Sequence, residues 1–300
     1  MDHPFYKQQA HEYYLKCHNL FEKELAASLP TPYPSVVSET SRNDYVYFEP
    51  LHIDQKKLTG PDLESLLNVS FESPSLFPDK NTYYIYDMSQ LKEIPYNTLM
   101  FQLNEAPKKS METTTIIMNR YFESRRVPYT LMNLMGEPLG YKQMLPYVFG
   151  DTCFVPESGA TKKPASWYAL HSVSEYVCHA KEKEVSLYSG HYPLLTLKTD
   201  KSSFEEQLNR SAHLYYIQSR LRIEYLQQHG SIKMEPKAEN LLDRFINTRS
   251  YHMPNYTAFD LIFYFIVYCT HKNLTLILGP DNPYLDEVKE RFKFPPFPLN

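Results

Sequence analysis

The stretch that decides the fold is YVFGDTCFVPESGATKKPASWYALHSV, residues 147–173. Aromatic and β-branched residues occupy both of its ends, and a loop rich in Gly, Ser, Thr and Pro separates them. Such runs are typical of β-strands, and connections this short join antiparallel neighbours. The stretch therefore predicts strands of one sheet, with a loop that carries Lys162 and Lys163 and leads into Trp167, the only tryptophan of the chain.

Similar runs, separated by Pro, Gly, Asn, Asp or Ser, extend over residues 82–199. They are TYYIYDM, TLMFQLN, TTTIIMNRYF and YTLMNLM before this stretch and EVSLYSG after it. We interpret all of them as strands of an antiparallel meander or small barrel, because the connections are too short for parallel crossovers.

A long helix is predicted after the strands, over SFEEQLNRSAHLYYIQSRL and onward to Gly230. Ser203 and Glu206 have the spacing of a capping box, and apolar residues such as Phe204 recur at helical intervals. The face away from most of these apolar residues carries Arg210, His213, Ile217 and Arg220. We expect that face to be solvated or to contact phosphates.

Shorter elements are expected on both sides of this core. They are helices at 5–29, 60–68, 236–248 and 283–292, a buried helix at 257–270, and a strand at LTLILG, residues 274–279. A Pro- and Ser-rich linker follows the first helix. The prediction is an α+β protein in three parts: a mainly helical extension at 1–78, a β-rich core with its helix at 79–248, and a small α/β extension at 249–300.

Composition narrows the class of protein. The four cysteines lie far apart without a CxxC pair, so we expect neither a disulfide framework nor a metal site. The longest apolar run, Phe259–Cys269, is too short to cross a bilayer, and the first residues do not resemble a signal peptide. We therefore expect a cytoplasmic protein without a membrane partner.

Sequence motifs for catalysis are missing. The chain has no P-loop, no GxGxxG and no GxSxG, so we expect neither an enzyme nor a cofactor. A catalytic role for His171, His191 or Glu205 has no supporting spacing.

Basic residues lie beside aromatic ones in the middle of the chain. Residues 116–222 hold 13 Lys and Arg against 10 Asp and Glu, whereas the whole chain has a net charge of -4. Arg120, Arg125 and Arg126 accompany the lysines of the loop. Each of these residues alone is explained as part of a solvated turn. Their clustering indicates contact with a polyanion such as DNA.

Three segments resemble the ComK family of competence transcription factors, in the same order along the chain. These are NRYFESRRVPYTLMNLMGEP, LPYVFGDTCFVPESGATKKPASWYALHSV and SFEEQLNRSAHLYYIQSRL. The resemblance covers residues 80–247. It implies a transcriptional activator that binds paired AT-rich DNA elements through the minor groove as a homo-oligomer, associates with the nucleoid, and is delivered to a Clp protease by an adaptor.

The resemblance also implies roles for individual residues. Trp167 and Phe204 match positions that we assign to the core. The residues assigned to DNA contact are Lys162, Lys163, Arg125, Arg126, Arg120, Arg210 and Arg220. The acidic flanks are longer than in the family, and this leaves open an alternative, a non-enzymatic scaffold or adaptor derived from ComK that acts through protein–protein contacts.

Overall fold

The computed structural model describes residues 50–136, 139–141, 143–160, 163–229 and 240–251, together with isolated positions between 257 and 287. The chain divides into two compact units, Met1–Val46 and Tyr47–Asn300, and all described residues belong to the second. The predicted helix at 5–29, the linker after it and Lys162 lie outside the described residues.

Seven strands form the larger sheet, in the spatial order β2-β5-β4-β3-β8-β7-β6. In chain order they are β2 (Phe71–Glu72), β3 (Thr82–Asp87), β4 (Thr98–Gln102), β5 (Lys108–Ser110), β6 (Tyr147–Phe149), β7 (Thr152–Pro156) and β8 (Trp167–Ala169). Neighbours run antiparallel except the edge pair of β2 and β5. The strands predicted at both ends of residues 147–173 are confirmed.

Four strands form the smaller sheet, in the order β1-β11-β10-β9. They are β1 (Ile53–Asp54), β9 (Glu175–His179), β10 (Glu184–Ser189) and β11 (Tyr192–Leu197). The last three are antiparallel hairpin neighbours, and β1 lies parallel to β11. The α+β class and the antiparallel sheets are confirmed, and both sheets are open rather than closed into a barrel.

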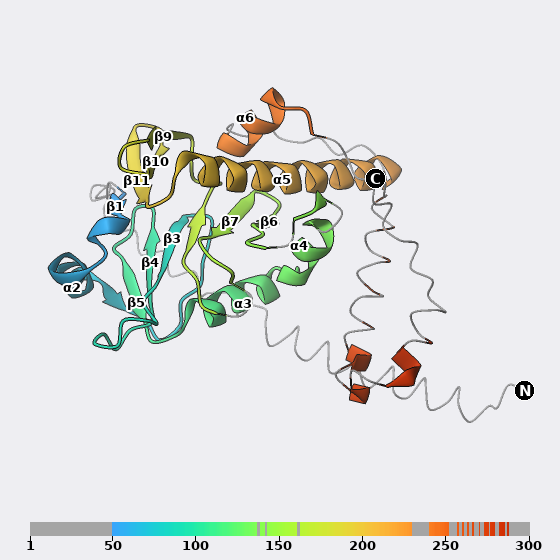
Figure 1. The fold of residues 1–300 in the computed structure, drawn as a ribbon, viewed down its shortest axis with the longest axis horizontal. Coiled ribbons are helices and arrows are strands. Elements are labelled where there is room, and N and C mark those ends of the chain that lie inside the picture. The colour runs from blue at the N-terminus through green and yellow to red at the C-terminus, as the bar shows by residue number, and fades with distance from the viewer. Residues whose placement is uncertain are drawn as a thin grey trace, which may run out of the picture. The chain divides into compact units, whose positions relative to one another are not determined.

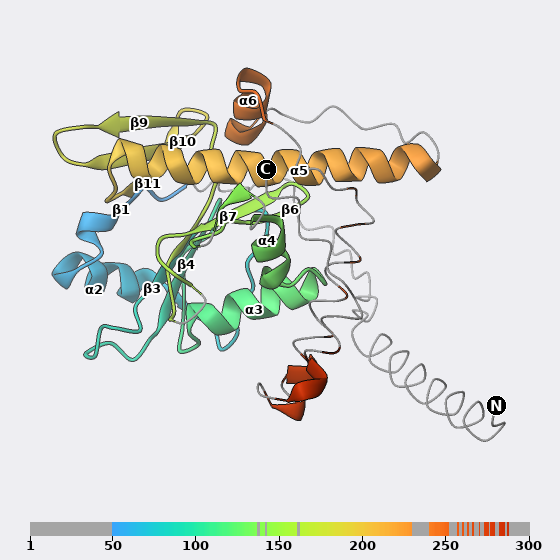
Figure 2. The same cartoon turned by 45° about the vertical axis from the view of Figure 1, so that its right-hand side comes forward.

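The helical elements with defined bounds are η1 (Gln55–Lys57), α2 (Gly60–Val69), α3 (Thr114–Ser124), α4 (Tyr129–Gly136), α5 (Lys201–His229) and α6 (Leu241–Thr248). Helices α3, α4 and α5 pack against the larger sheet. The long helix α5 lies across strands β6, β7 and β10, and α6 packs against it (Figures 1 and 2). The predicted helix at 60–68 corresponds to α2, and the one predicted from Ser203 to Gly230 corresponds to α5. The described part of the helix predicted at 236–248 is α6. Among these described elements, none is long and apolar enough to cross a membrane.

Strands β7 and β8 are buried on both faces. Successive side chains of a strand point to opposite faces, so the rings of Trp167 and Tyr168 lie on opposite faces of β8. Trp167 meets Phe122 of α3 with ring centroids 5.9 Å apart, and Tyr168 stacks with Phe204 of α5 at 6.4 Å. The sheet is thus a central layer with α3 on one side and α5 on the other, and Trp167 and Phe204 are core residues with 3% and 1% exposure.

The prediction of strands at 113–122 and 129–135 is wrong, because these residues form α3 and α4. Thr113 caps α3 by accepting a hydrogen bond from the Ile116 amide. Ile117 and Tyr121, one helical turn apart, are buried against the sheet. A helical burial pattern therefore outweighs the β-branched and aromatic composition, which by itself favours strands.

The start and the outer face of α5 also differ from the prediction. Asp200, rather than Ser203, caps the helix, because its carboxylate accepts hydrogen bonds from the Ser203 amide and hydroxyl, both at 2.9 Å. His213 and Ile217 are buried, and His213 lies between Tyr141 and Tyr251. This face of α5 is therefore packed at both residues, not solvated.

The C-terminal predictions are corrected in two places. Positions 274, 275, 277 and 278 are helical, so the predicted strand at 274–279 is wrong. Positions 260, 263, 266 and 270 are helical as expected, but Phe263 and Ile266 are 47% and 57% exposed. The described positions of the last predicted helix, 283–285 and 287, are helical.

Replacing Phe204 by Ala removes the ring that α5 buries against Tyr168, and we expect unfolding free energy to fall by about 3–5 kcal/mol. Phe71→Ala is the matched control, since Phe71 is 67% exposed and its loss should cost less than about 1 kcal/mol. Urea unfolding followed by circular dichroism measures both. An equal decrease in unfolding free energy for the two variants would contradict the packing of Phe204 against Tyr168.

Candidate functional site

The loop between β7 and β8 is held to the body of the protein at its two ends. The Glu157 amide donates to the Ser166 carbonyl at 2.9 Å, which closes the loop. The Ala165 amide donates to Thr114 Oγ1 at 3.2 Å and so fastens the loop to the start of α3. Lys163 is exposed on this loop. The loop therefore presents Lys163 beside α3.

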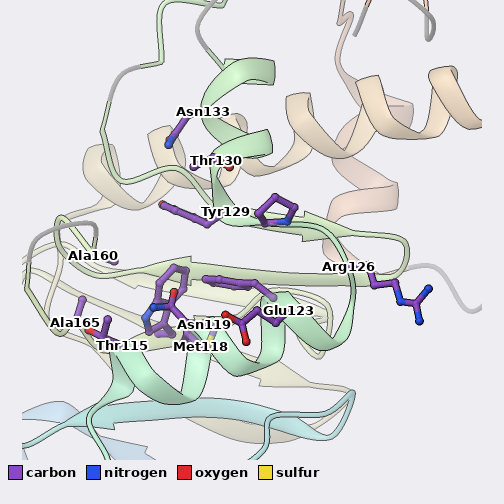
Figure 3. Close-up of a pocket in the computed structure, with 13 residues that line it drawn as sticks. Thr115, Met118, Asn119, Glu123, Arg126, Tyr129, Thr130, Asn133, Ala160 and Ala165 are labelled. Carbon is purple, nitrogen blue, oxygen red and sulfur yellow. The ribbon is translucent and has the colours of Figure 1, made fainter. Parts of the chain in front are cut away.

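A pocket of about 630 Å³ lies between α3, α4 and this loop (Figure 3). Three rings form an aromatic wall. Phe122 stacks on Tyr129 with centroids 5.5 Å apart, and Trp167 meets both rings edge-on at 5.9 and 5.8 Å. Burial raises the pKa of Tyr129 above its ordinary value, so its hydroxyl stays protonated and donates to the Leu145 carbonyl at 2.5 Å.

Polar side chains line the two helical sides of the pocket. Thr115, Asn119 and Glu123 come from α3, and Thr130 and Asn133 come from α4 on the opposite side (Figure 3). Amide and hydroxyl groups both donate and accept hydrogen bonds, and aromatic walls suit planar or apolar groups. The pocket is suited to a polar, partly flat ligand.

Arg125 and Arg126 are exposed at the end of α3. Arg126 borders the pocket, and the Arg125 guanidinium lies over the Tyr121 ring. The Arg126 amide donates to the Glu123 carbonyl, and the Val127 amide to the Phe122 carbonyl, which is the Schellman arrangement that ends a helix. In this arrangement the residue just after the helix end takes a left-handed backbone conformation, for which glycine is usual. Here that residue is Arg126, with φ of 55°. Figure 3 shows its side chain extending away from the pocket.

Arg120 is held by internal bonds instead. Its guanidinium forms an ion pair with Glu112 and donates to Ser75 Oγ at 2.6 Å and to the Leu76 carbonyl at 3.0 Å. The guanidinium lowers the pKa of Glu112, and Glu112 raises that of Arg120. Arg120 therefore braces α3 against residues 75–76.

Arg210 and Arg220 lie on α5, on the other face of the sheet from α3 (Figure 1). Arg210 pairs with Glu206, donates to the Gln143 carbonyl at 2.9 Å, and lies over the Tyr141 ring. Arg220 is exposed. The structure thus places Arg126 and the 157–166 loop, which carries Lys163, on the border of one pocket, and places the two α5 arginines on the other face of the sheet.

The sequence argument missed the polar residues of α3 and α4. Thr115 and Asn119 are one helical turn apart, as are Thr130 and Asn133, and each pair lines the pocket. Their helical spacing could have identified these residues, but the sequence analysis predicts strands for both segments.

Histidines and carboxylates elsewhere have structural partners. His171 Nδ1 lies 3.1 Å from the Cys153 backbone, and Glu205 accepts from the Tyr176 hydroxyl at 3.0 Å. In the described ranges, no three His, Cys, Asp or Glu side chains form a group that could hold a metal ion.

Comparison with known proteins gives no match: no family model fits the chain, and neither curated proteins nor solved structures match it. The functional argument therefore depends on the geometry of this pocket and its surroundings, and on the sequence resemblance.

Replacing Arg120 by Ala should lower unfolding free energy at pH 7 by about 1–3 kcal/mol, because charged hydrogen bonds to Glu112 and the chain are lost. The lowered pKa of Glu112 means that this carboxylate stabilises the fold above its ordinary pKa of 4.5 and ceases to do so as pH falls. Urea unfolding at pH 7 and pH 3.5 measures the difference between Arg120→Ala and wild type. That difference should shrink at pH 3.5, and Arg220→Ala, the exposed control, should change little at either pH.

Proposed function

We propose that this chain is a DNA-binding transcriptional regulator of the ComK type, which binds AT-rich duplex DNA as an oligomer. The contact surface is the α3–loop surface, defined as Arg125, Arg126, Lys163 and the pocket side chains Asn119 and Asn133. One observation carries the proposal: residues from α3, α4 and the 157–166 loop, apart in sequence, gather around one pocket with exposed cations beside it.

The chemistry of the α3–loop surface suits a DNA minor groove. Exposed Lys and Arg neutralise phosphates and release their counterions. The minor groove of AT-rich DNA is narrow and strongly negative, and it offers mainly hydrogen-bond acceptors. The amide groups of Asn119 and Asn133 supply donors of the required kind.

Two of the cations that the sequence analysis assigned to DNA contact are held in internal ion pairs. Arg120 and Arg210 already pair with Glu112 and Glu206, so using either of them for DNA would break an existing ion pair. Arg220 lies on the helix at the opposite face. The proposal assigns DNA contact to Arg125 and Arg126, which are exposed at the end of α3, and to the lysines of the loop.

Binding to an AT-rich and a GC-rich duplex, measured by fluorescence anisotropy at several salt concentrations, tests the proposal. We expect AT preference and a log–log salt slope of about -0.9 for each phosphate neutralised. Arg125→Ala and Lys163→Ala should each weaken binding to both duplexes and make the slope shallower by about 1. Arg220→Ala removes the same charge from α5 and should leave the slope unchanged.

A folded protein that binds neither duplex at low salt would contradict the proposal. That result would favour the alternative, a scaffold or adaptor that acts through protein–protein contacts. Equal losses for Arg220→Ala and Lys163→Ala would place DNA on a different surface.

Replacing Arg126 by Gly should have opposite effects on stability and binding. Glycine relieves the left-handed strain, so we expect unfolding free energy to rise by about 0.5–1 kcal/mol. Loss of the guanidinium should weaken DNA binding and reduce the salt slope. Thermal unfolding and anisotropy on the same preparation measure both, and a variant that is more stable yet binds as wild type would remove Arg126 from the contact surface.

A further inference from the structure

A second pocket, of about 400 Å³, lies on the α5 side of the larger sheet. Its walls come from η1, the ends of β7 and β11, and the first turns of α5. Leu197, Tyr168 and Phe204 supply apolar surface, and polar side chains supply the rest. The DNA proposal uses none of these residues, so this pocket requires its own explanation.

Glu157 lies on the wall of this pocket without a basic partner. Gln55 Nε2 donates to its carboxylate and also to the Tyr84 hydroxyl. Within the described part of the chain, no Lys, Arg or His forms an ion pair with it. Burial raises the pKa of Glu157 to about 7. A half-buried carboxylate of this kind is stabilised by a cation that enters from outside.

Two residues that line this pocket each carry a buried polar atom without a hydrogen-bond partner. Gln207 Oε1 and Arg210 Nε are both buried, and the two residues lie one turn apart on α5. The other Arg210 nitrogens bind Gln143 and Glu206. Folded proteins rarely leave such atoms unpaired, so a ligand that pairs with them has a site already built for it.

Glu157 and the two unpaired atoms specify the chemistry of that ligand. Glu157 and Gln207 are acceptors that suit a primary ammonium group, which has three N–H donors. Arg210 Nε is a donor that suits a carboxylate, and exposed Lys198 at the rim adds positive charge. We propose that this pocket binds a free α-amino acid, with its ammonium group on Glu157 and Gln207 and its carboxylate on Arg210.

Binding of each of the common L-amino acids at 5 mM, followed by thermal unfolding of the full chain at pH 8, tests the proposal. A ligand that binds only the folded state raises the unfolding temperature, and the shift grows as the ligand concentration increases. We expect at least one amino acid to do so, and its decarboxylated amine and deaminated acid to do so much less. No shift with any amino acid, or equal shifts with the amine alone, would overturn the proposal.

Two variants and a pH change locate the site. Glu157→Gln keeps the shape and the contact to Gln55 but removes the charge, and it should weaken binding at least 10-fold by calorimetry. Gln207→Met is a second probe that leaves Glu157 intact and should weaken binding less. Glu175→Gln, at an exposed carboxylate of β9, should bind as wild type. If Glu157→Gln and Gln207→Met both bind the amino acid as tightly as wild type, the proposed site is wrong.

Affinity should fall by roughly 30-fold from pH 8 to pH 5.5, since the ammonium then meets a protonated Glu157. The other titratable or charged groups around Glu157 are Tyr84, Tyr86, Tyr168, Lys198, Glu206 and Arg210. A midpoint near pH 7 that disappears in Glu157→Gln assigns the pH dependence of binding to Glu157. DNA binding is measured separately and its failure leaves this proposal intact.

Discussion

Strands β7 and β8 bury side chains on both of their faces, and the arrangement of the helices follows from that constraint. Adjacent residues of a strand point in opposite directions, so Trp167 needs apolar cover on one side and Tyr168 on the other. Helix α3 provides the first through Phe122, and α5 provides the second through Phe204. Burying large rings in this way is the dominant favourable contribution to folding, and it makes the sheet the middle layer of three.

The same constraint positions the loop between these strands where it borders both pockets. Glu157, at its first residue, lines the pocket on the α5 side, whereas Ala160 and Ala165 line the pocket on the α3 side. The two pockets differ in chemistry. The first has an aromatic wall with exposed cations beside it, and the second has a carboxylate and unpaired polar atoms. The ligands proposed for the two faces of the sheet, duplex DNA and a free amino acid, therefore differ as well.

Some of the basic side chains of this protein are held in ion pairs with carboxylates of the same chain. The chain has a net charge of -4, so a basic surface exists only where acidic side chains leave Lys and Arg exposed. Glu112 engages Arg120, which ties α3 to residues 75–76, whereas Glu206 engages Arg210 within α5. Arg126 holds a strained backbone conformation that glycine would adopt without cost. Strain of this kind is retained where a side chain has a use, which fits the role proposed for Arg126.

The sequence by itself determined the α+β class, the strands on both sides of the 157–166 loop, the helices α2 and α5, and the buried positions of Trp167 and Phe204, because these depend on local runs and on the size of the rings. It did not predict α3 and α4, whose β-branched and aromatic residues favour strands until the sheet buries one helical face of each. It also could not separate the arginines, since the Arg210 guanidinium contacts Gln143, 67 residues away, and Arg120 reaches Ser75. Only the tertiary structure decided which cations are exposed and which polar side chains share a pocket, because both depend on contacts between segments distant in the chain.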